Sequence, residues 1–460
     1  MAGKGRGNVQ NTVFGVIRQR LNSLSRKEYE TLYSMCRIAK NLYNQTLYNI
    51  RQHFFQTGSY LRYEENYHLL KHSENYRRLN SNMAQQIIKK AHANFPAFFS
   101  LLKRAREKNL PRPSLPKYLP KDGLYPLHIA MFSIKDGYLT IPVSKQGKEI
   151  FGEVKIRVPK VVLGLDIKEI RIIPKAKGRW FEVHYIYRMK EKEEKKEKPQ
   201  KVLSVDLGID NLATCVSSEG KAFIVDGKDL KAVNQWFNKE LARLKSVYAK
   251  QGIKSGKRLA VLSEKRQSRI RDYMHKTAKL LLDFCLKEGI DLVVVGDCSS
   301  IYEKPKLGRV NNQNMKFLPL GYLKDLIRHK CEKYGIAYME MDEAYTSQAD
   351  SLSKDYIPKH YEKGDFRFSG RRISRGLYLS GTGKVINADV NGAINILRKT
   401  GFEPEFSHVP VPRRIKVWRN APKGAYAVVG ASEPPSEDKA GIKLANSSES
   451  SMLYSMEWFT

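Results

Sequence analysis

Hydrophobic spacing in the first part of the chain predicts a β-domain interrupted by helices. Residues 8 to 20 alternate apolar and polar side chains, which predicts one strand. Ser25 and Glu28 form a capping-box pair, and from there to about residue 106 apolar positions recur every three or four residues, as in amphipathic helices. Short alternating runs between 130 and 188 predict the strands of a small barrel, which the first strand would complete. The helical block is therefore expected to be an insertion in a β-barrel domain.

The second part of the chain predicts a mixed α/β sheet. An apolar run at 202–205 opens a set of hairpin-type strands, and two long helical stretches follow it. A fully apolar strand at 290–296, a helix at 318–334 and a strand at 336–343 come next, and this order implies parallel pairing beneath a covering helix. With a last helix opening at Asp389, the order is that of an RNase H-like sheet.

Two isolated acids interrupt these apolar elements. Asp206 follows the run 202–205, where a core strand would carry another aliphatic side chain. Such a carboxylate is costly to desolvate unless it is paired or holds a metal. For Asp206 alone, capping its own turn is a sufficient explanation. Asp389 is a second acid of this kind, and one acid on a strand with one at the start of a helix fits a nuclease of the RNase H type.

Composition indicates a polyanionic partner. The 460 residues contain 82 Lys plus Arg against 47 Asp plus Glu, a formal charge of +35, which favours nucleic acid. A hydrophobic fraction of 41% is sufficient for packed cores. No apolar run is long enough to cross a bilayer, and residues 1 to 7 lack the apolar segment of a signal peptide. We expect a cytoplasmic protein without a membrane partner.

The cysteines predict no metal site. Five of them are far apart and mostly lie in apolar runs, so they are expected to be buried free thiols of a reducing compartment. They are Cys36, Cys215, Cys285, Cys298 and Cys331.

Three segments together resemble the TnpB family of RNA-guided nucleases: Val205 to Asp210, Tyr345 to Gln348, and Asn387 to Ile396. This family is encoded by IS200/IS605- and IS607-type insertion sequences and is ancestral to type V CRISPR effectors. The resemblance covers roughly residues 8 to 400. It implies an α/β RuvC (RNase H-like) nuclease domain and a β-barrel wedge domain with an inserted helical recognition domain.

The resemblance also implies partners and a division of the chain. The partners would be a guide RNA from the transposon end, with one protein per RNA, and double-stranded target DNA carrying a short adjacent motif that the protein reads. A prokaryotic protein of this kind would join the nucleoid when bound to DNA. The expected parts are wedge strand 1–24, recognition helices 25–110, wedge barrel 111–190, linker 191–201, RuvC domain 202–345, insert 346–386, closing RuvC helix 387–402 and a largely disordered tail 403–460.

Two departures from the family pattern affect the site. Members usually carry a four-cysteine zinc ribbon after the Tyr345 segment, but residues 349–353 contain no cysteine, so an insert without zinc is expected. The middle catalytic acid usually ends the fourth strand, where this chain has Gly296. Asp297 comes one residue later, and strand alternation would turn it to the other face. Glu343 ends the next parallel strand, about 4.8 Å away, and is the better candidate, although it could instead cap the following turn.

The expected chemistry is metal-dependent cleavage of DNA. Asp206, Glu343 and Asp389 would bind two Mg²⁺ or Mn²⁺ ions, one activating water and the other stabilising the leaving 3′ oxygen. Arg371, Arg372 and Arg375 would form a phosphate-facing loop near the cleft, or solvated surface. Gln85, with Lys89 and Lys90 on the same predicted helix, would contribute to reading the target-adjacent motif.

Two other functions stay open on sequence grounds. A nuclease-inactive RNA-guided repressor of the same family is favoured by Gly296 but opposed by the presence of Asp206 and Asp389. A DNA transposase in its own right would share the sheet and the acids without a guide RNA.

Overall fold

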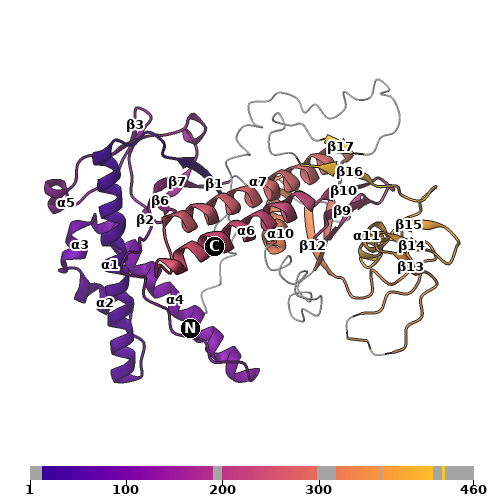
Figure 1. The fold of residues 1–460 in the computed structure, drawn as a ribbon, viewed down its shortest axis with the longest axis horizontal. Helices are drawn as coiled ribbons and strands as arrows, with labels where there is room; N and C mark the ends of the chain where they lie inside the picture. The colour runs from indigo at the N-terminus through magenta and orange to yellow at the C-terminus, as the bar shows by residue number, and fades with distance from the viewer. Residues whose placement is uncertain are drawn as a thin grey trace, which may run out of the picture. The chain divides into compact units, whose positions relative to one another are not determined.

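The computed structural model describes residues 13–189, 199–297, 318–359, 361–362 and 364–417, and the backbone of 427–429. The chain divides into two compact units, one ending at Lys190 and the other beginning at Glu191 (Figure 1). Each unit has its own hydrophobic clusters, so each is described by itself.

Two antiparallel sheets make up the β-structure in the described part of the N-terminal unit. Their strand orders are β1-β7-β6-β2 and β3-β4-β5. The strands are β1 (Phe14–Arg20), β2 (Leu127–Ile129), β3 (Ile134–Lys135), β4 (Tyr138–Thr140), β5 (Lys155–Arg157), β6 (Ile167–Lys175) and β7 (Trp180–Arg188). Closure of these sheets into one barrel stays a prediction.

A block of helices separates β1 from β2 along the chain. It comprises α1 (Arg26–Thr57), α2 (Tyr63–Leu70), α3 (Glu74–Arg78) and α4 (Ser81–Glu107), and two short elements follow between the later strands, α5 (Lys145–Ile150) and a 3₁₀ turn (Lys160–Val162). α1 begins at the predicted capping box, where the Ser25 hydroxyl and the Glu28 carboxylate each accept from the other residue's backbone N–H. Since β1 and β2 belong to one sheet, the helices are an insertion between two of its strands. Buried side chains of α1 and α4 share one hydrophobic cluster with the sheet residues.

The described C-terminal unit contains a seven-stranded sheet with the order β12-β11-β8-β9-β10-β16-β17. Its first three strands along the chain pair antiparallel, whereas β11 and β12 run parallel to β8 and to each other. They are β8 (Val202–Leu207), β9 (Asn211–Ser217), β10 (Ala222–Asp226), β11 (Leu292–Asp297) and β12 (Ala337–Asp342), with helices α6 (Lys228–Lys250), α7 (Lys257–Glu288), α10 (Leu320–Lys333) and α11 (Ala388–Arg398). This order of strands confirms the predicted RNase H-like sheet.

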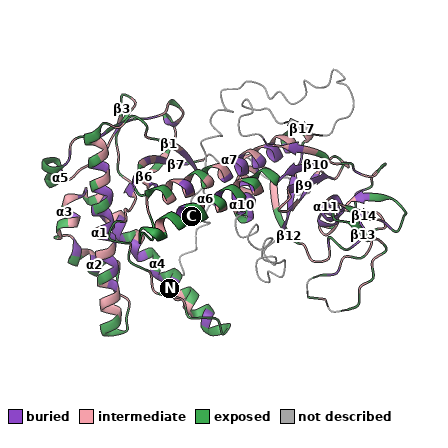
Figure 2. Cartoon of the chain, in the orientation of Figure 1, coloured by how far each residue is buried: buried purple, intermediate pink, exposed green. Residues whose placement is uncertain are grey.

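The closing helix α11 packs on one face of this sheet. Val202, Leu292 and Val294 form a cluster with Ile396 and Leu397 of α11. Since side chains alternate along a strand, the even-numbered positions of β8 and β11 face this helix. Most of α11 is buried, as Figure 2 shows. Asp206 and Gly296 therefore lie on the α11 face.

Residues 403–417, which the sequence assigned to a largely disordered tail, include a strand, and the rest of that prediction falls mostly outside the described residues. Strand β16 (Arg413–Lys416) pairs in parallel with β10, and β17 (Ala427–Val429) pairs with β16. Ile415 and Val417 are buried. The sequence could not reveal this strand, because an apolar side chain between basic ones is too short a pattern, and the open edge of β10 supplies the hydrogen-bonding partner.

Two predictions from composition can be compared with the structure. Cys36, Cys215, Cys285 and Cys331 are free and buried as expected, whereas Cys298 lies outside the described residues. No helix in the described ranges combines the length and hydrophobicity required to span a bilayer.

Candidate active site

Asp206 lies between the sheet and α11. It faces the helix from β8, and the helix has a glycine opposite it, since a Cβ added at Gly392 would lie 3.0 Å from Asp206 Oδ2. The small residue lets the carboxylate approach the helix closely. The glycine of the last sequence motif therefore provides space for the acid of the first.

Asp389 comes from the first turn of the same helix. The Asn387 side chain caps α11 by accepting from the backbone N–H of Asp389 at 3.0 Å and of Val390 at 3.2 Å. Asp389 and Gly392 are one helical turn apart and so lie on one face. Asp389 consequently shares the space between helix and sheet with Asp206, at a helix N-terminus that favours negative charge.

Glu343 reaches this space from the end of β12. Gly296 lies opposite Met341 in the β11–β12 ladder, and a Cβ added at Gly296 would lie 2.7 Å from Glu343 Cγ and 2.8 Å from its Cδ. The Glu343 side chain therefore occupies the volume that a side chain at position 296 would fill. Because Val295 pairs with Val205, Gly296 is the next position along beside Asp206.

The electrostatics of these acids reflect burial and mutual repulsion. Burial raises the pKa of Asp206 well above its ordinary value, and the charges of Glu343 and Asp389 raise it further. Burial also raises the pKa of Glu343 to about 7, with the charge of Asp297 as the next cause. Glu343 Oε1 is buried and has no hydrogen-bond partner among the described residues. A buried carboxylate oxygen without a partner is energetically costly, and a bound cation would compensate it.

The segment after Glu343 is held by helix α11. Tyr345 adopts a left-handed backbone conformation with φ 61°, which is strained for a non-glycine residue. Asn395 donates to the carbonyls of Thr346 at 2.9 Å and Ala349 at 2.7 Å. Asn391 also donates to Ala349, at 2.8 Å. The turn that presents Glu343 is thus tied to the helix that carries Asp389.

These asparagines were missed by sequence reasoning. Asn391 and Asn395 are fully buried although they lie inside an apolar helical pattern. Polar side chains four residues apart on such a face must find buried partners, and this spacing was the available signal.

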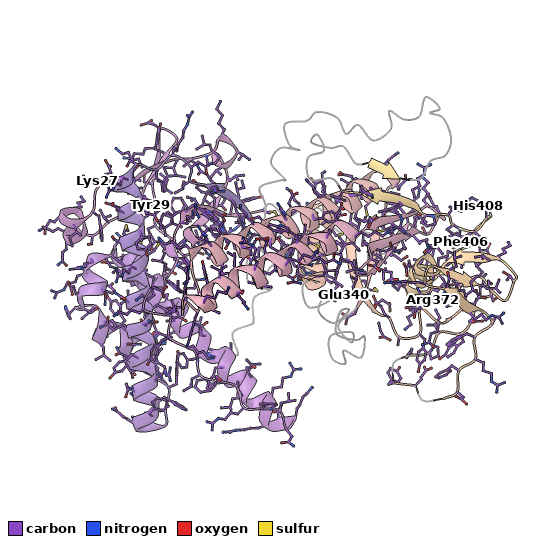
Figure 3. The ribbon with its side chains drawn as sticks, in the orientation of Figure 1. Lys27, Tyr29, Glu340, Arg372, Phe406 and His408 are labelled. Atoms are coloured by element: carbon purple, nitrogen blue, oxygen red, sulfur yellow. The ribbon has the colours of Figure 1, made fainter. Side chains whose placement is uncertain are left out.

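Asp297 is paired on the α10 side of β11. Its carboxylate accepts from Lys324 of α10 at 2.8 Å, and the same ammonium group donates to Glu340 at 2.7 Å. Glu340 is labelled in Figure 3. The contact with α10 agrees with the alternation that turns Asp297 to the other face of β11. Which acid acts in catalysis stays a proposal.

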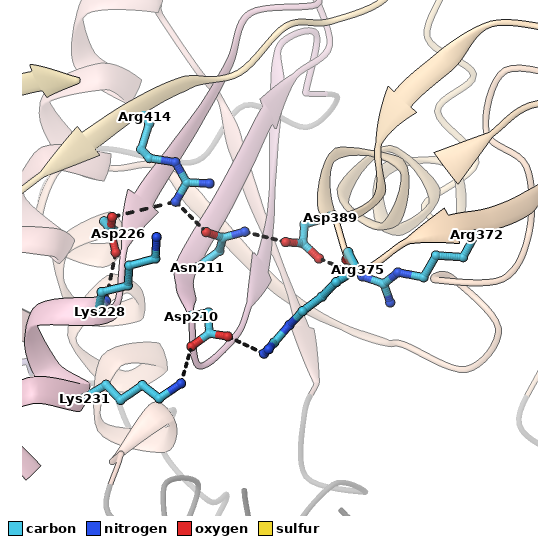
Figure 4. Close-up of polar contacts among 9 residues, drawn as sticks. All are labelled: Asp210, Asn211, Asp226, Lys228, Lys231, Arg372, Arg375, Asp389 and Arg414. Carbon is cyan, nitrogen blue, oxygen red and sulfur yellow. Dashed lines mark hydrogen bonds and ion pairs between the residues drawn. The ribbon is translucent and has the colours of Figure 1, made fainter. Parts of the chain in front are cut away.

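A basic hairpin lies beside the acids. Strands β13 (Arg371–Ser374), β14 (Leu377–Leu379) and β15 (Val385–Asn387) form a small antiparallel sheet. Arg372 Nη2 lies 3.7 Å from Asp389 Oδ1, and Arg375 donates to Asp210 in the loop after Asp206 (Figure 4). Of the three exposed arginines predicted to face phosphate, Arg372 therefore lies close to Asp389 and Arg375 is bound to Asp210. Arg371 lies in β13 opposite Leu379.

The insert without cysteines has a buried carboxylate at its centre. Asp350 accepts hydrogen bonds from the hydroxyls of Ser353 at 2.8 Å and Ser380 at 2.7 Å, and from Gly381 N at 2.7 Å. The side chain is fully buried, yet these donors lower the pKa of Asp350 despite its burial. This network links residues 350–353 to the β14–β15 turn.

The residues proposed to read the target-adjacent motif belong to the N-terminal unit. Gln85 Nε2 donates to the Tyr76 hydroxyl at 3.4 Å, and the Lys89 ammonium lies 5.6 Å from the centre of the Tyr63 ring. Lys90 is half-buried on the same helix. Their contribution to DNA recognition stays a prediction.

Asp206, Glu343 and Asp389 have the oxygen ligands that a hard divalent ion prefers, but their carboxylates do not surround a single position. No group of three or more His, Cys, Asp or Glu side chains in the described ranges is arranged to hold a metal ion. Carboxylate oxygens are nevertheless the ligands that Mg²⁺ and Mn²⁺ prefer, and the orphan Oε1 of Glu343 is unsatisfied without one.

The chain is similar to proteins of a transposase family and to Cas12f1-like proteins. A family described as a probable transposase, OrfB_IS605, matches residues 184–301, and the TNB domain of Cas12f1-like proteins matches residues 321–396. The TnpB-like protein ORF457 of Acidianus two-tailed virus is 23% identical over 401 residues, which cover 79% of this chain and 81% of that protein.

A solved structure supports the fold. The cryo-EM structure of a Cas12f1-sgRNA-target DNA complex matches with a TM-score of 0.50 and 14% identity, over 81% of this chain and 83% of that one. The chain therefore has a Cas12-like fold that contains a RuvC domain.

Proposed function

We propose that this chain is a member of the TnpB family and a metal-dependent endonuclease that an RNA guides to double-stranded DNA. A single RuvC site would cut the DNA next to a short target-adjacent motif. The proposal rests mainly on the position of the Glu343 side chain, which fills the volume above Gly296 beside Asp206. It supports a third acid at the position where the fourth strand lacks one, and this argues against the nuclease-inactive repressor.

Asp206, Glu343 and Asp389 would hold the metal, with the wedge barrel and recognition helices as the nucleic-acid-binding remainder. A divalent ion such as Mg²⁺ or Mn²⁺ bound there would supply Lewis-acid activation of water and charge neutralisation at the phosphodiester. Because the pKa values of Asp206 and Glu343 are raised, both carboxyls must lose protons before they can act as ligands.

The cationic side chains have a separate task. Arg372 and Arg375 lie at the same end of the sheet and can donate to phosphate oxygens of a strand entering the site. Sequence choice would come from base pairing with one guide RNA per protein, while the net charge of +35 supports backbone contacts by other Lys and Arg side chains. Gln85, Lys89 and Lys90 are proposed to help read the adjacent motif.

An acid swap tests the assignment of Glu343. The protein is produced with the RNA encoded beside its gene and assayed on a plasmid that carries the matching target. Glu343→Gln should reduce cleavage about 1,000-fold, the scale of losing a group that stabilises the transition state. Adding Gly296→Glu to Glu343→Gly should restore part of the activity, because the new carboxylate would enter the same volume.

Asp297→Asn is the matched control and should retain cleavage, since Asp297 is bound to Lys324 on the α10 face. Full activity of Glu343→Gln together with loss in Asp297→Asn would contradict the assignment. A wild-type complex that binds its target but does not cut it would refute the enzymatic proposal itself.

A further inference from the structure

The strand β16 contributes an arginine to the surroundings of Asp389. Arg414 Nη1 donates to Asn211 Oδ1 at 2.8 Å, and Asn211 Nδ2 donates to Asp389 Oδ2. Figure 4 shows this row of contacts from β16 through the start of β9 to the first turn of α11. It joins residues from three elements that lie far apart in the sequence.

The guanidinium determines which way the Asn211 amide points. A guanidinium has only donors, so it requires the amide oxygen on its side. The NH₂ end of Asn211 must then face Asp389 and donate to it. Without Arg414, the amide would be free to rotate and place its oxygen against the carboxylate, which would repel it.

Arg414 is itself anchored. The guanidinium Nη1 lies 3.7 Å from Asp226 Oδ2, and Asp226 is buried at the end of β10. The other oxygen of Asp226 accepts from Lys228 N at 2.8 Å at the start of α6. In the sheet, Arg414 lies opposite Ile224, so pairing of β16 with β10 sets its position along the strand.

We propose that Arg414 and Asn211 are positioning residues for Asp389, an inference that rests on the proposed metal-dependent function. By donating to Oδ2, Asn211 fixes the rotation of the Asp389 carboxylate, which would hold a metal ion. Arg372 Nη2 lies 3.7 Å from the other oxygen, Oδ1. The C-terminal strand is thus part of the active centre, although the sequence places it beyond the nuclease domain.

Binding of Mn²⁺ to the full-length protein, measured by electron paramagnetic resonance without RNA or DNA, tests the proposal. The Mn²⁺ binding that is lost in Asp389→Ala is taken as the binding at this site. Arg414→Gln and Asn211→Leu should each weaken that binding about 10- to 100-fold, as expected when a hydrogen-bond partner of a ligand is lost. In Arg414→Lys the ammonium group can still donate to Asn211, so this variant should weaken Mn²⁺ binding less.

Arg413→Gln is the matched control, because Arg413 is the exposed neighbour on the same strand and should leave Mn²⁺ binding unchanged. Thermal unfolding identifies any variant that fails to fold. If Arg414→Gln is such a variant, Asn211→Leu still tests the inference. Folded Arg414→Gln and Asn211→Leu proteins with wild-type Mn²⁺ affinity would overturn the inference. Because the readout is binding, a wild type that does not cut DNA would refute only the proposed function.

Discussion

Both units of the protein contain half-buried carboxylates, but they neutralise them differently. In the N-terminal sheet, Glu169 accepts from His128 Nδ1 and Arg171 Nη2, each at 2.8 Å. Burial alone would raise the pKa of Glu169, yet these donors bring it down to about 2. In the C-terminal unit, burial raises the pKa of Asp206 and of Glu343, and other acids raise both further.

A second acid in the N-terminal sheet follows the same rule. Burial would raise the pKa of Glu182, but the hydrogen bond from His184 and the charge of Lys175 bring it to about 2. A buried acid with its own donors is a structural element, because its charge is compensated within the fold. Acids grouped without sufficient compensation mark a site that requires an external cation.

The largest expected effect separates these two kinds of acid. Asp206→Asn should reduce cleavage about 1,000-fold or more, because it removes a ligand from the reacting centre. Glu169→Gln should leave the cleavage rate of folded protein nearly unchanged but lower the free energy of unfolding by about 3 kcal/mol, since it removes the negative charge with which Arg171 is paired. Initial cleavage rates and denaturant unfolding measure the two effects. If both variants were less stable and both still cleaved DNA, the distinction between the two kinds of acid would be wrong.

The pH dependence of stability sharpens the comparison. The pKa of Glu343 is about 7 in the folded protein, above the ordinary value of 4.5. The unfolded chain therefore releases this proton first, and the contribution of Glu343 to stability falls as the pH rises from about 4.5 to about 7.

Glu343→Gln has no proton to release at this position. Without metal, its stability relative to wild type should increase across that range by roughly 3 kcal/mol and then level off. Denaturant unfolding of both proteins between pH 4.5 and 8 measures the difference. A difference that does not vary with pH would show that the pKa of Glu343 in the folded protein is not raised above its value in the unfolded chain.

The smallest expected effect concerns an exposed cation at the site. The Arg375 side chain is 82% exposed where it meets Asp210, so this pair contributes little to stability. Arg375→Gln should change the free energy of unfolding by less than about 1 kcal/mol. It should also weaken DNA binding by the RNA complex and reduce the slope of its logarithmic salt dependence by about 1. An unchanged salt slope would mean that Arg375 contacts no phosphate.

Local patterns were sufficient for the plan of the C-terminal unit. The apolar run before Asp206, the apolar strand before Gly296 and the motif around Asp389 are each contiguous, and each was assigned from the sequence. Alternation along β11 also predicted that Asp297 would leave the cleft, and its contact with α10 agrees. The family resemblance supplied the expectation of a third acid, and strand spacing pointed to Glu343.

Tertiary structure alone decided how these acids are held. The volume above Gly296 that receives Glu343, the asparagines of α11 that hold the following turn, and the strand β16 all depend on partners distant in the sequence. Asn211 and Asp389 are 178 residues apart, and Arg414 and Asn211 are 203 apart. Hydrophobic periodicity records which face of an element is buried, but it carries no information about which distant side chain will complete a hydrogen bond there.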